Sequence, residues 1–198
     1  MLLFADGSSA MPRGGVGVVL VCRDEDRIRV TVEGAPLPDG AKVTNQRAEV
    51  AAIAAAAEKA RTRSILWTDS TYAAGVVQPH ISGWRPKANL DVIKPAIGVV
   101  KQAALTAIVH VTGHVNRKHD LPAMFFHDLA DQSAGKAAVT GTETVETAFN
   151  ARAHLACLTC VFFPCRGNTH HDAACDKRAE WPHRVVERFT MPIVATHL

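Results

Sequence analysis

The sequence predicts an α/β fold with a five-stranded mixed sheet flanked by helices, followed by a small cysteine-rich C-terminal appendage. Three strand-like segments joined by short turns precede residue 34, which indicates an antiparallel meander. Strand-like and helical segments then alternate up to residue 138, and strands connected through helices pair in parallel. Four of the five cysteines lie beyond this alternation, between residues 157 and 175.

Each segment of the meander carries a strand signal. Residues 2–5 are a short apolar run, and residues 14–22 are rich in β-branched side chains. From residue 28 to residue 33, apolar residues alternate with polar ones, which is the period of a half-buried strand. A polar turn at residues 24–26 separates the second and third strands, and a loop follows at residues 36–40.

The second half begins with a helix rich in alanine, the best helix former, with larger apolar residues at helical spacing. In chain order we expect a helix at 45–63, a strand at 65–68, a helix at 71–77, an irregular segment at 79–86, a helix at 90–103, a strand at 107–111 and a helix at 121–138. We therefore expect a main domain over residues 1–140, a linker without clear periodicity over 141–150, and a separate extension over 151–198.

Composition sets broad limits on the class of protein. At 198 residues and 47% apolar content, the chain suits one medium domain plus an appendage. A formal net charge of +3 permits nucleic-acid binding without requiring it. No segment is long and apolar enough to span a membrane, and an acid at position 6 comes too early for a secretory signal. We expect a cytoplasmic monomer without membrane contact.

Four acidic residues stand in distinctive settings. Asp6 follows Phe-Ala and precedes Gly-Ser, and Glu49 ends Thr-Asn-Gln-Arg-Ala-Glu. Asp69 lies in Trp-Thr-Asp-Ser at the end of a predicted strand, and Asp131 lies on the last predicted helix. Carboxylates gathered from separate elements repel one another unless cations lie between them, and hard divalent cations prefer such ligands. The pattern predicts a metal-dependent phosphoryl-transfer site, although helix caps and solvated surface charges are the alternative.

These settings, in this order and followed by Thr-Gly-His at residues 112–114, resemble ribonuclease H of type 1 over roughly residues 1–140. The resemblance implies a ribonuclease H-like fold and an endoribonuclease that hydrolyses the RNA strand of RNA–DNA hybrids, leaving 3′-hydroxyl and 5′-phosphate ends. Two alternatives stay open. One is a DNA nuclease of the resolvase or integrase type, and the other is a hybrid- or RNA-binding module without catalysis.

The resemblance also implies roles for individual residues. The four acids would hold two Mg²⁺ (or Mn²⁺) ions, and His114 would assist proton transfer or product release, with His119 and His127 as rival histidines. Residues expected to contact the hybrid are Gly7, Ser8, Asn45, Gln46 and Ser70. The start of the alanine-rich helix has a second interpretation, since Thr44 or Asn45 is also a suitable N-cap.

The C-terminal extension predicts a zinc site. Four of the five residues Cys157, Cys160, Cys165, His170 and Cys175 are the expected ligands, and His171 could replace His170 in a competing set. Reduced packed cysteines or a labile disulfide are the alternatives. Basic and aromatic residues in the same segment suggest a contribution to nucleic-acid binding, against a role as a stability cap or protein contact.

Overall fold

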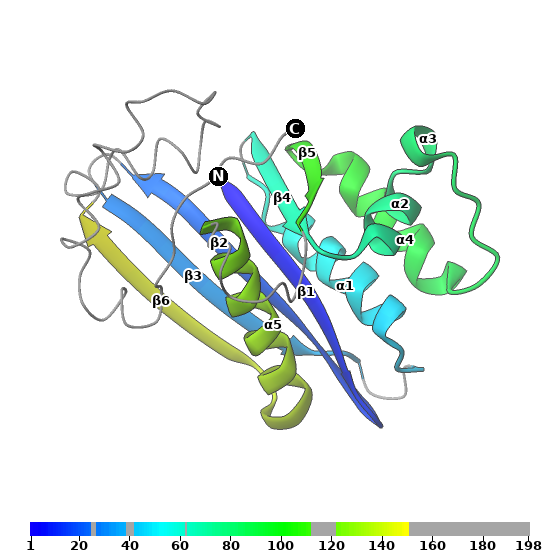
Figure 1. Cartoon of the computed structure of the whole chain (residues 1–198), viewed down its shortest axis with the longest axis horizontal. Coiled ribbons are helices and arrows are strands. Elements are labelled where there is room, and N and C mark those ends of the chain that lie inside the picture. The colour runs from blue at the N-terminus through cyan, green and yellow to red at the C-terminus, as the bar shows by residue number, and fades with distance from the viewer. Residues whose placement is uncertain (25–26, 39–41, 62, 112–121, 151–198) are drawn as a thin grey trace.

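A computed structural model describes residues 1–24, 27–38, 42–61, 63–111 and 122–150. It has a six-stranded mixed sheet in the order β5-β4-β1-β2-β3-β6 (Figure 1). Three strands form the predicted antiparallel meander: β1 (Leu2–Ala10), β2 (Arg13–Asp24) and β3 (Arg27–Pro36). Two strands extend the sheet in parallel on the other side of β1: β4 (Ser64–Thr68) and β5 (Leu105–His110). The predicted mixed sheet is therefore confirmed.

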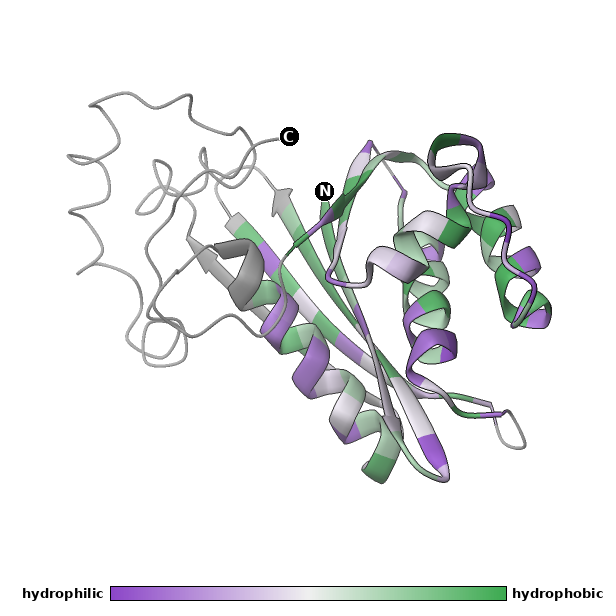
Figure 2. Cartoon of the chain, turned by 45° about the vertical axis from the view of Figure 1, so that its right-hand side comes forward, coloured by the Kyte–Doolittle hydropathy of each residue, from purple (hydrophilic) through white to green (hydrophobic). Residues whose placement is uncertain are grey.

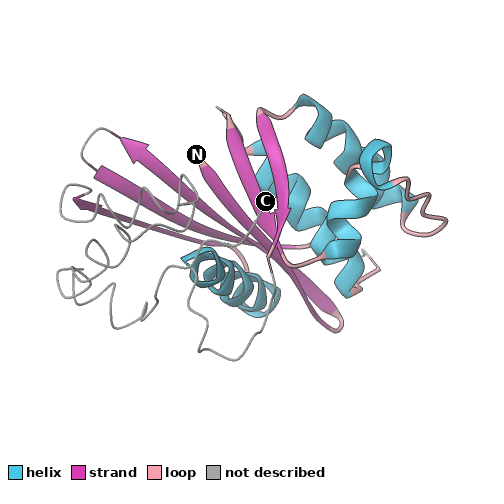
Figure 3. Ribbon diagram, turned by 45° about the horizontal axis from the view of Figure 1, so that its top comes forward, coloured by secondary structure: helices cyan, strands magenta, loops and turns pink. Residues whose placement is uncertain are grey.

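Helices cover both faces of this sheet (Figure 3). One face carries α1 (Asn45–Glu58), α2 (Thr71–Val77), α3 (Pro79–Ser82) and α4 (Leu90–Gln102). The other face carries α5 (Pro122–Thr140), which packs across β1, β2 and β3. Among the described residues, no helix combines the length and apolar composition that a bilayer crossing requires.

The alternation of side chains along β1 divides the apolar residues between two cores. Leu3 and Ala5 pack with α1, α2 and α4, whereas Leu2 and Phe4 pack with α5. Figure 2 shows hydrophobic residues along much of the sheet and of the helices that cover it. Because Asp6 has the same parity as Leu2 and Phe4, its side chain belongs to the α5 face of the sheet.

The helix α5 approaches the sheet closely because glycines line its contact. Gly17 lies directly opposite Asp6 in the β1–β2 register. A Cβ atom on Gly17 would lie only 1.9 Å from the carbonyl oxygen of Ala130 on α5, so no larger residue fits without moving the helix. The same helix carries His127 and Asp131, and the closeness of this contact sets how deeply those two side chains reach.

The structure corrects two predictions about the strands. The segment expected to be a linker contains a sixth strand, β6 (Glu143–Asn150), which pairs antiparallel with β3 along its length. An ion pair joins the two strands, with Nε of Arg29 3.2 Å from Oε1 of Glu146. In addition, β1 continues to Ala10, so Asp6 lies in the middle of its strand rather than at its end. Strand β1 is longer than its apolar run because its pairing with β2 continues to Ala10.

Candidate active site

Four elements bring the predicted acids together. Asp6 lies within β1, and Asp69 directly follows β4, the parallel neighbour of β1. Glu49 lies in the second turn of α1, and Asp131 lies on α5. The negative charges of the other three all act on Asp6, and Asp131 also shares a hydrogen bond with it. The structure thus gathers the four residues that the sequence singled out.

The carboxyl group of Asp6 is the most strongly perturbed of the four. Its pKa is raised to about 9, first by burial, since only 5% of the residue is exposed, and then by the charges of Glu49, Asp69 and Asp131 in that order. The hydrogen bond with Asp131 acts in the same direction because it favours the protonated Asp6 carboxyl as a donor. At neutral pH without a cation, this carboxyl group therefore holds a proton.

Glu49 is held against the backbone of β1. The backbone N–H of Gly7 donates a hydrogen bond to the Glu49 carboxylate. A Cβ atom on Gly7 would lie 2.2 Å from the carbonyl carbon of Ala48, so only glycine permits this approach of α1 to β1. Burial and the charge of Asp69 nevertheless raise the pKa of Glu49 to about 8, and the Gly7 hydrogen bond only partly opposes them. Its Oε2 is buried and has no hydrogen-bond partner.

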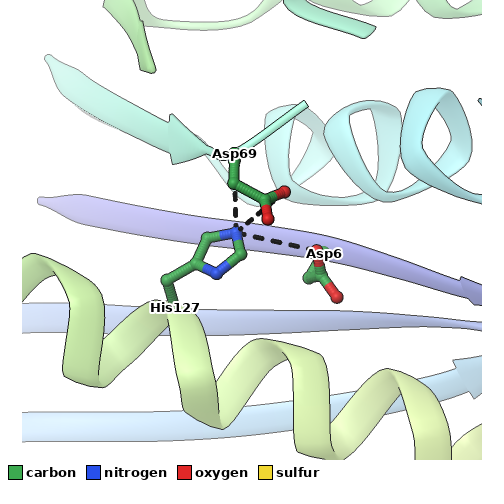
Figure 4. A group of neighbouring side chains, drawn as sticks. All are labelled: Asp6, Asp69 and His127. Carbon is green, nitrogen blue, oxygen red and sulfur yellow. Dashed lines mark hydrogen bonds and ion pairs between the residues drawn. The ribbon is translucent and has the colours of Figure 1, made fainter. Parts of the chain in front are cut away.

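A histidine completes the pocket. His127 is 3% exposed, and its Nε2 lies 3.6 Å from Oδ1 of Asp6 and 3.5 Å from Oδ1 of Asp69 (Figure 4). The same Nε2 accepts a hydrogen bond of 3.2 Å from the backbone N–H of Asp69. One nitrogen therefore contacts two of the four acids and also fixes the backbone just after β4. Ligand atoms of Asp6, Asp69 and His127 all lie within 4.8 Å of one another.

This donor set fits a divalent cation. Carboxyl groups from four elements interact with one another, and burial together with the charges of the neighbouring acids raises the pKa values of Asp6 and Glu49. The buried Oε2 of Glu49 lacks a partner, which a cation would supply. A cation would displace the protons and replace mutual repulsion with coordination.

Three of the five residues expected to contact substrate, Asn45, Gln46 and Ser70, lie at the start of α1 or just after β4. Asn45 and Gln46 are exposed at the first turn of α1, and the Ser9 hydroxyl donates a hydrogen bond to Oδ1 of Asn45. Thr44 is the N-cap, since its hydroxyl accepts from the N–H of Arg47 at 3.3 Å. The N-cap is therefore Thr44 and not Asn45, the other candidate from the sequence. The side chains of Asn45 and Gln46 take no part in capping the helix.

The remaining predicted contacts have mixed positions. Gly7 lies against Glu49, and Ser8 is partly buried two residues beyond Asp6 on the same strand. The Ser70 hydroxyl caps α2 by accepting from the N–H of Ala73 at 3.1 Å. Ser70 therefore stabilises the start of α2, and this role is independent of any contact with substrate.

Some predicted residues lie outside the described part of the chain. These are His114 and His119, and the expected zinc ligands Cys157, Cys160, Cys165, His170 and Cys175. His127, which the sequence offered only as a rival to His114, is the histidine that the described structure places among the acids. The sequence did contain one indication of this position. His127 lies four residues before Asp131, and residues four apart share one face of a helix.

Comparisons with known proteins agree with this geometry. A model of the RNase H family matches residues 1–139. Among solved structures, the chain is similar to RNase H1 from the halophilic archaeon Halobacterium salinarum, at 24% identity and a TM-score of 0.51, over 69% of this chain and 95% of that one. It is also similar to the RNase H domain of prototype foamy virus, at 21% identity and a TM-score of 0.55, over 69% of this chain and 93% of that one.

A third similar structure is the foamy viral protease-reverse transcriptase in complex with an RNA/DNA hybrid. The identity is 20% and the TM-score 0.52, and the match covers 70% of this chain but only 20% of that one. Comparison with curated proteins gives no significant match. At these identities the structural similarities establish a shared fold, and the match to the family model covers most of the chain.

Proposed function

The chain belongs to the RNase H family, and from this premise we propose that it is an endoribonuclease that hydrolyses the RNA strand of RNA–DNA hybrids. The observation that supports the proposal is the electrostatic interaction of Asp6 on β1 with three further acids, which are carried by α1, by the residue after β4 and by α5. Acids beside a phosphate backbone would weaken binding unless a cation neutralised them, so their concentration here favours catalysis over simple binding.

We propose that Asp6, Glu49, Asp69 and Asp131 hold two Mg²⁺ (or Mn²⁺) ions. Such ions, when bound, activate a water molecule as nucleophile and stabilise the charge on the departing 3′ oxygen. The protein's own part is to fix the ligands. Asp6 is held by the pairing of β1 with its two neighbouring strands, and Glu49 is oriented by the Gly7 N–H. The backbone of Asp69 is fixed by His127.

The substrate part of the proposal rests on two supports. The similar foamy viral enzyme has been solved with an RNA/DNA hybrid bound. In this chain, the exposed amide side chains of Asn45 and Gln46 follow directly after the Thr44 cap, on the helix that carries Glu49. Amides there could hydrogen-bond the 2′-hydroxyls by which proteins distinguish RNA from DNA.

A cleavage assay tests this proposal. Hybrid, duplex RNA and duplex DNA substrates are incubated with the full chain, with and without Mg²⁺ or Mn²⁺. We expect metal-dependent cleavage of the RNA strand of the hybrid alone, and we expect Asp6→Asn to lower its rate at least about 1,000-fold because it removes a metal ligand. Asp91→Asn is the matched control, because Asp91 is an exposed aspartate that pairs with Arg47 on α1.

The other outcomes of this assay identify other functions. Cleavage of duplex DNA would indicate a nuclease of the resolvase or integrase type. Tight binding of the hybrid without cleavage under any metal would indicate a binding module. Hybrid cleavage that persists at the wild-type rate in Asp6→Asn would refute the assignment of the pocket.

A further inference from the structure

The role given so far to the histidine beside the acids is to fix the backbone of Asp69, although the same ring also lies against two carboxyl groups. Only 4% of the His127 side chain is exposed, and the ring extends from α5 toward Asp6 and Asp69 (Figure 4). Nε2 of this histidine lies beside one oxygen of each of the two carboxyl groups, so three potential ligand atoms lie within 4.8 Å of one another. Such an arrangement is typical of a metal centre.

We propose that Nε2 of His127 is a direct ligand of a divalent ion in this pocket and shifts the preference of the site from Mg²⁺ toward Mn²⁺. This inference rests on the proposed function, because it concerns an ion held by the same carboxylates. It goes beyond that function by adding a nitrogen ligand and a metal preference.

The hydrogen bond that the ring accepts supports coordination. Nε2 accepts a hydrogen bond from the Asp69 N–H, and a nitrogen that accepts a hydrogen bond presents its lone pair. A nitrogen in this state presents the lone pair that a metal ion requires. The present hydrogen bond is 3.2 Å long, and the lone pair would exchange this backbone N–H for the ion.

The distances also suit coordination. Neighbouring ligands of an octahedral ion with bonds of about 2.1 Å lie roughly 3 Å apart. The nitrogen lies 3.6 Å from the Asp6 oxygen and 3.5 Å from the Asp69 oxygen. Movements of about half an ångström would bring the three atoms to ligand spacing, which lies within the reach of side-chain rotation.

The metal preference follows from the chemistry of the ligands. Mg²⁺ binds oxygen ligands and keeps much of its water shell, so it gains little from an imidazole nitrogen. Mn²⁺ accepts carboxylate oxygens equally well, and as a first-row transition ion it also binds nitrogen. A pocket with carboxylates and one imidazole therefore favours Mn²⁺ over Mg²⁺ more than carboxylates alone would.

The test measures metal binding by the full chain directly. Electron spin echo spectroscopy of the Mn²⁺-loaded protein detects ¹⁴N nuclei bonded to the ion, and titration calorimetry gives the dissociation constants for Mn²⁺ and Mg²⁺. We expect a nitrogen coupling in the wild type that is absent in His127→Asn. We also expect His127→Asn to weaken Mn²⁺ binding about tenfold or more and Mg²⁺ binding much less.

Two controls separate coordination from structural effects. His110 contacts the carbonyl oxygen of Asp69 at 3.0 Å but is exposed, so His110→Asn should keep both the coupling and the metal affinities. If His127→Asn fails to fold, wild-type protein labelled with ¹⁵N-histidine answers the same question, because the isotope changes the coupling only when a histidine is bonded to Mn²⁺.

The outcomes distinguish this inference from the function it rests on. Mn²⁺ bound by the wild type without a nitrogen coupling, or equal loss of Mn²⁺ and Mg²⁺ affinity in His127→Asn, would overturn the inference. In that case His127 only positions the Asp69 backbone, and the proposed nuclease stands. Absence of divalent binding in the wild type, or binding unaffected by Asp6→Asn, would instead overturn the proposed function.

Discussion

Asp6 shows how a single residue can weaken a fold in order to build a site. Its carboxyl group is buried opposite Gly17, where no side chain from β2 can pair with it. A phenylalanine and an alanine precede it on the same strand and are fully buried in the two cores. The local sequence therefore predicts the strand, whereas the placement of a charge among apolar neighbours indicates function.

The perturbed acids make the metal-free protein sensitive to pH. The folded-state pKa values of Asp6 and Glu49, about 9 and about 8, exceed the ordinary values of 3.8 and 4.5. Protons therefore bind the folded state more tightly than the unfolded state. Their stabilising contribution is fully present below about pH 4 and is lost as pH rises toward 9.

We expect Asp6→Asn to raise the free energy of unfolding of the metal-free protein by about 1–3 kcal/mol at pH 8, because the amide carries no charge to bury. That corresponds to about 2–4 °C in melting temperature per kcal/mol. The measurement is thermal unfolding in chelator from pH 5 to pH 9, where the variant should depend on pH less than the wild type.

Two comparisons check the cause of this effect. Asp91→Asn should not raise stability, because the Arg47 guanidinium lowers the pKa of Asp91 and favours its charged form. Added Mn²⁺ should stabilise the wild type more than Asp6→Asn. If the free energy of unfolding of the wild type rose between pH 5 and pH 9, ionisation of the buried acids would not destabilise the metal-free fold.

His127 marks the limit of prediction from sequence at this scale. The acids could be predicted because each has a distinctive local setting along the chain. The contact of His127 with Asp6 and Asp69 joins residues 121 and 58 positions apart, so no local pattern carries it. Only the packing of α5 on the sheet brings the ring into the pocket.

Among the elements, α5 decides whether the site is complete. It contributes both Asp131 and His127, and it rests on Gly15 and Gly17 of β2 and on Gly34 of β3. A Cβ atom at each of these glycines would come within 2.6 Å of an α5 atom. Because these three glycines have no side chains, α5 lies close to the sheet, and this closeness sets how far Asp131 and His127 reach toward the other acids.

We expect Gly17→Ala to destabilise the fold by about 1–3 kcal/mol, because the added methyl group would overlap the Ala130 carbonyl and push α5 away. Cleavage of the hybrid should fall about 100-fold, since a displacement near 1 Å misplaces ligands. Chemical denaturation and the cleavage assay provide the two measurements.

Gly135→Ala is the matched control on the same helix. A Cβ atom there meets nothing within 4 Å, and replacing glycine inside a helix with alanine should stabilise it by about 0.5–1 kcal/mol. If both variants behaved alike, close contact at Gly17 would not be what positions α5.

The sequence predicted most elements but not their full extent. Helix α2 was predicted with its observed bounds, whereas α1 ends at Glu58 and not at residue 63 as predicted. Strand β6 escaped prediction because its local sequence lacks a clear apolar alternation. What makes it a strand is pairing with β3, which lies more than one hundred residues earlier in the chain.

At the scale of the whole molecule, the predicted site and the fold that builds it lie within residues 1–150. The acids span positions 6 to 131, and the match to the family model covers residues 1–139. Residues 151–198, which carry the predicted zinc ligands, lie beyond both. We propose that this extension adds affinity for nucleic acid through its basic and aromatic residues and takes no part in the chemistry.

We expect a chain ending at residue 150 to keep its turnover number on the hybrid within about threefold while KM rises, because uniform binding is lost and the transition state is not affected. The difference in KM between the full chain and the chain ending at residue 150 should become smaller at high salt, where the attraction between charges is screened. Steady-state kinetics at two salt concentrations measure both.

A chain ending at residue 142 is the control for this truncation, because it also removes β6 and leaves β3 as an edge strand. It should unfold more readily than the chain ending at residue 150. An unchanged KM in the longer truncation would remove the extension from hybrid binding, and a lost turnover number would give it a catalytic or structural role.

The parity of β1 has a consequence for how this sequence can change over time. Inserting one residue between Phe4 and Asp6 would rotate the carboxylate through the sheet to the α1 side and would turn an apolar neighbour toward α5. Changes of length at the tip, between Ala10 and Arg13, leave that orientation intact. Insertions and deletions are therefore compatible with activity at the tip of the hairpin and incompatible with it between Phe4 and Asp6, where residues can be substituted but their number is fixed.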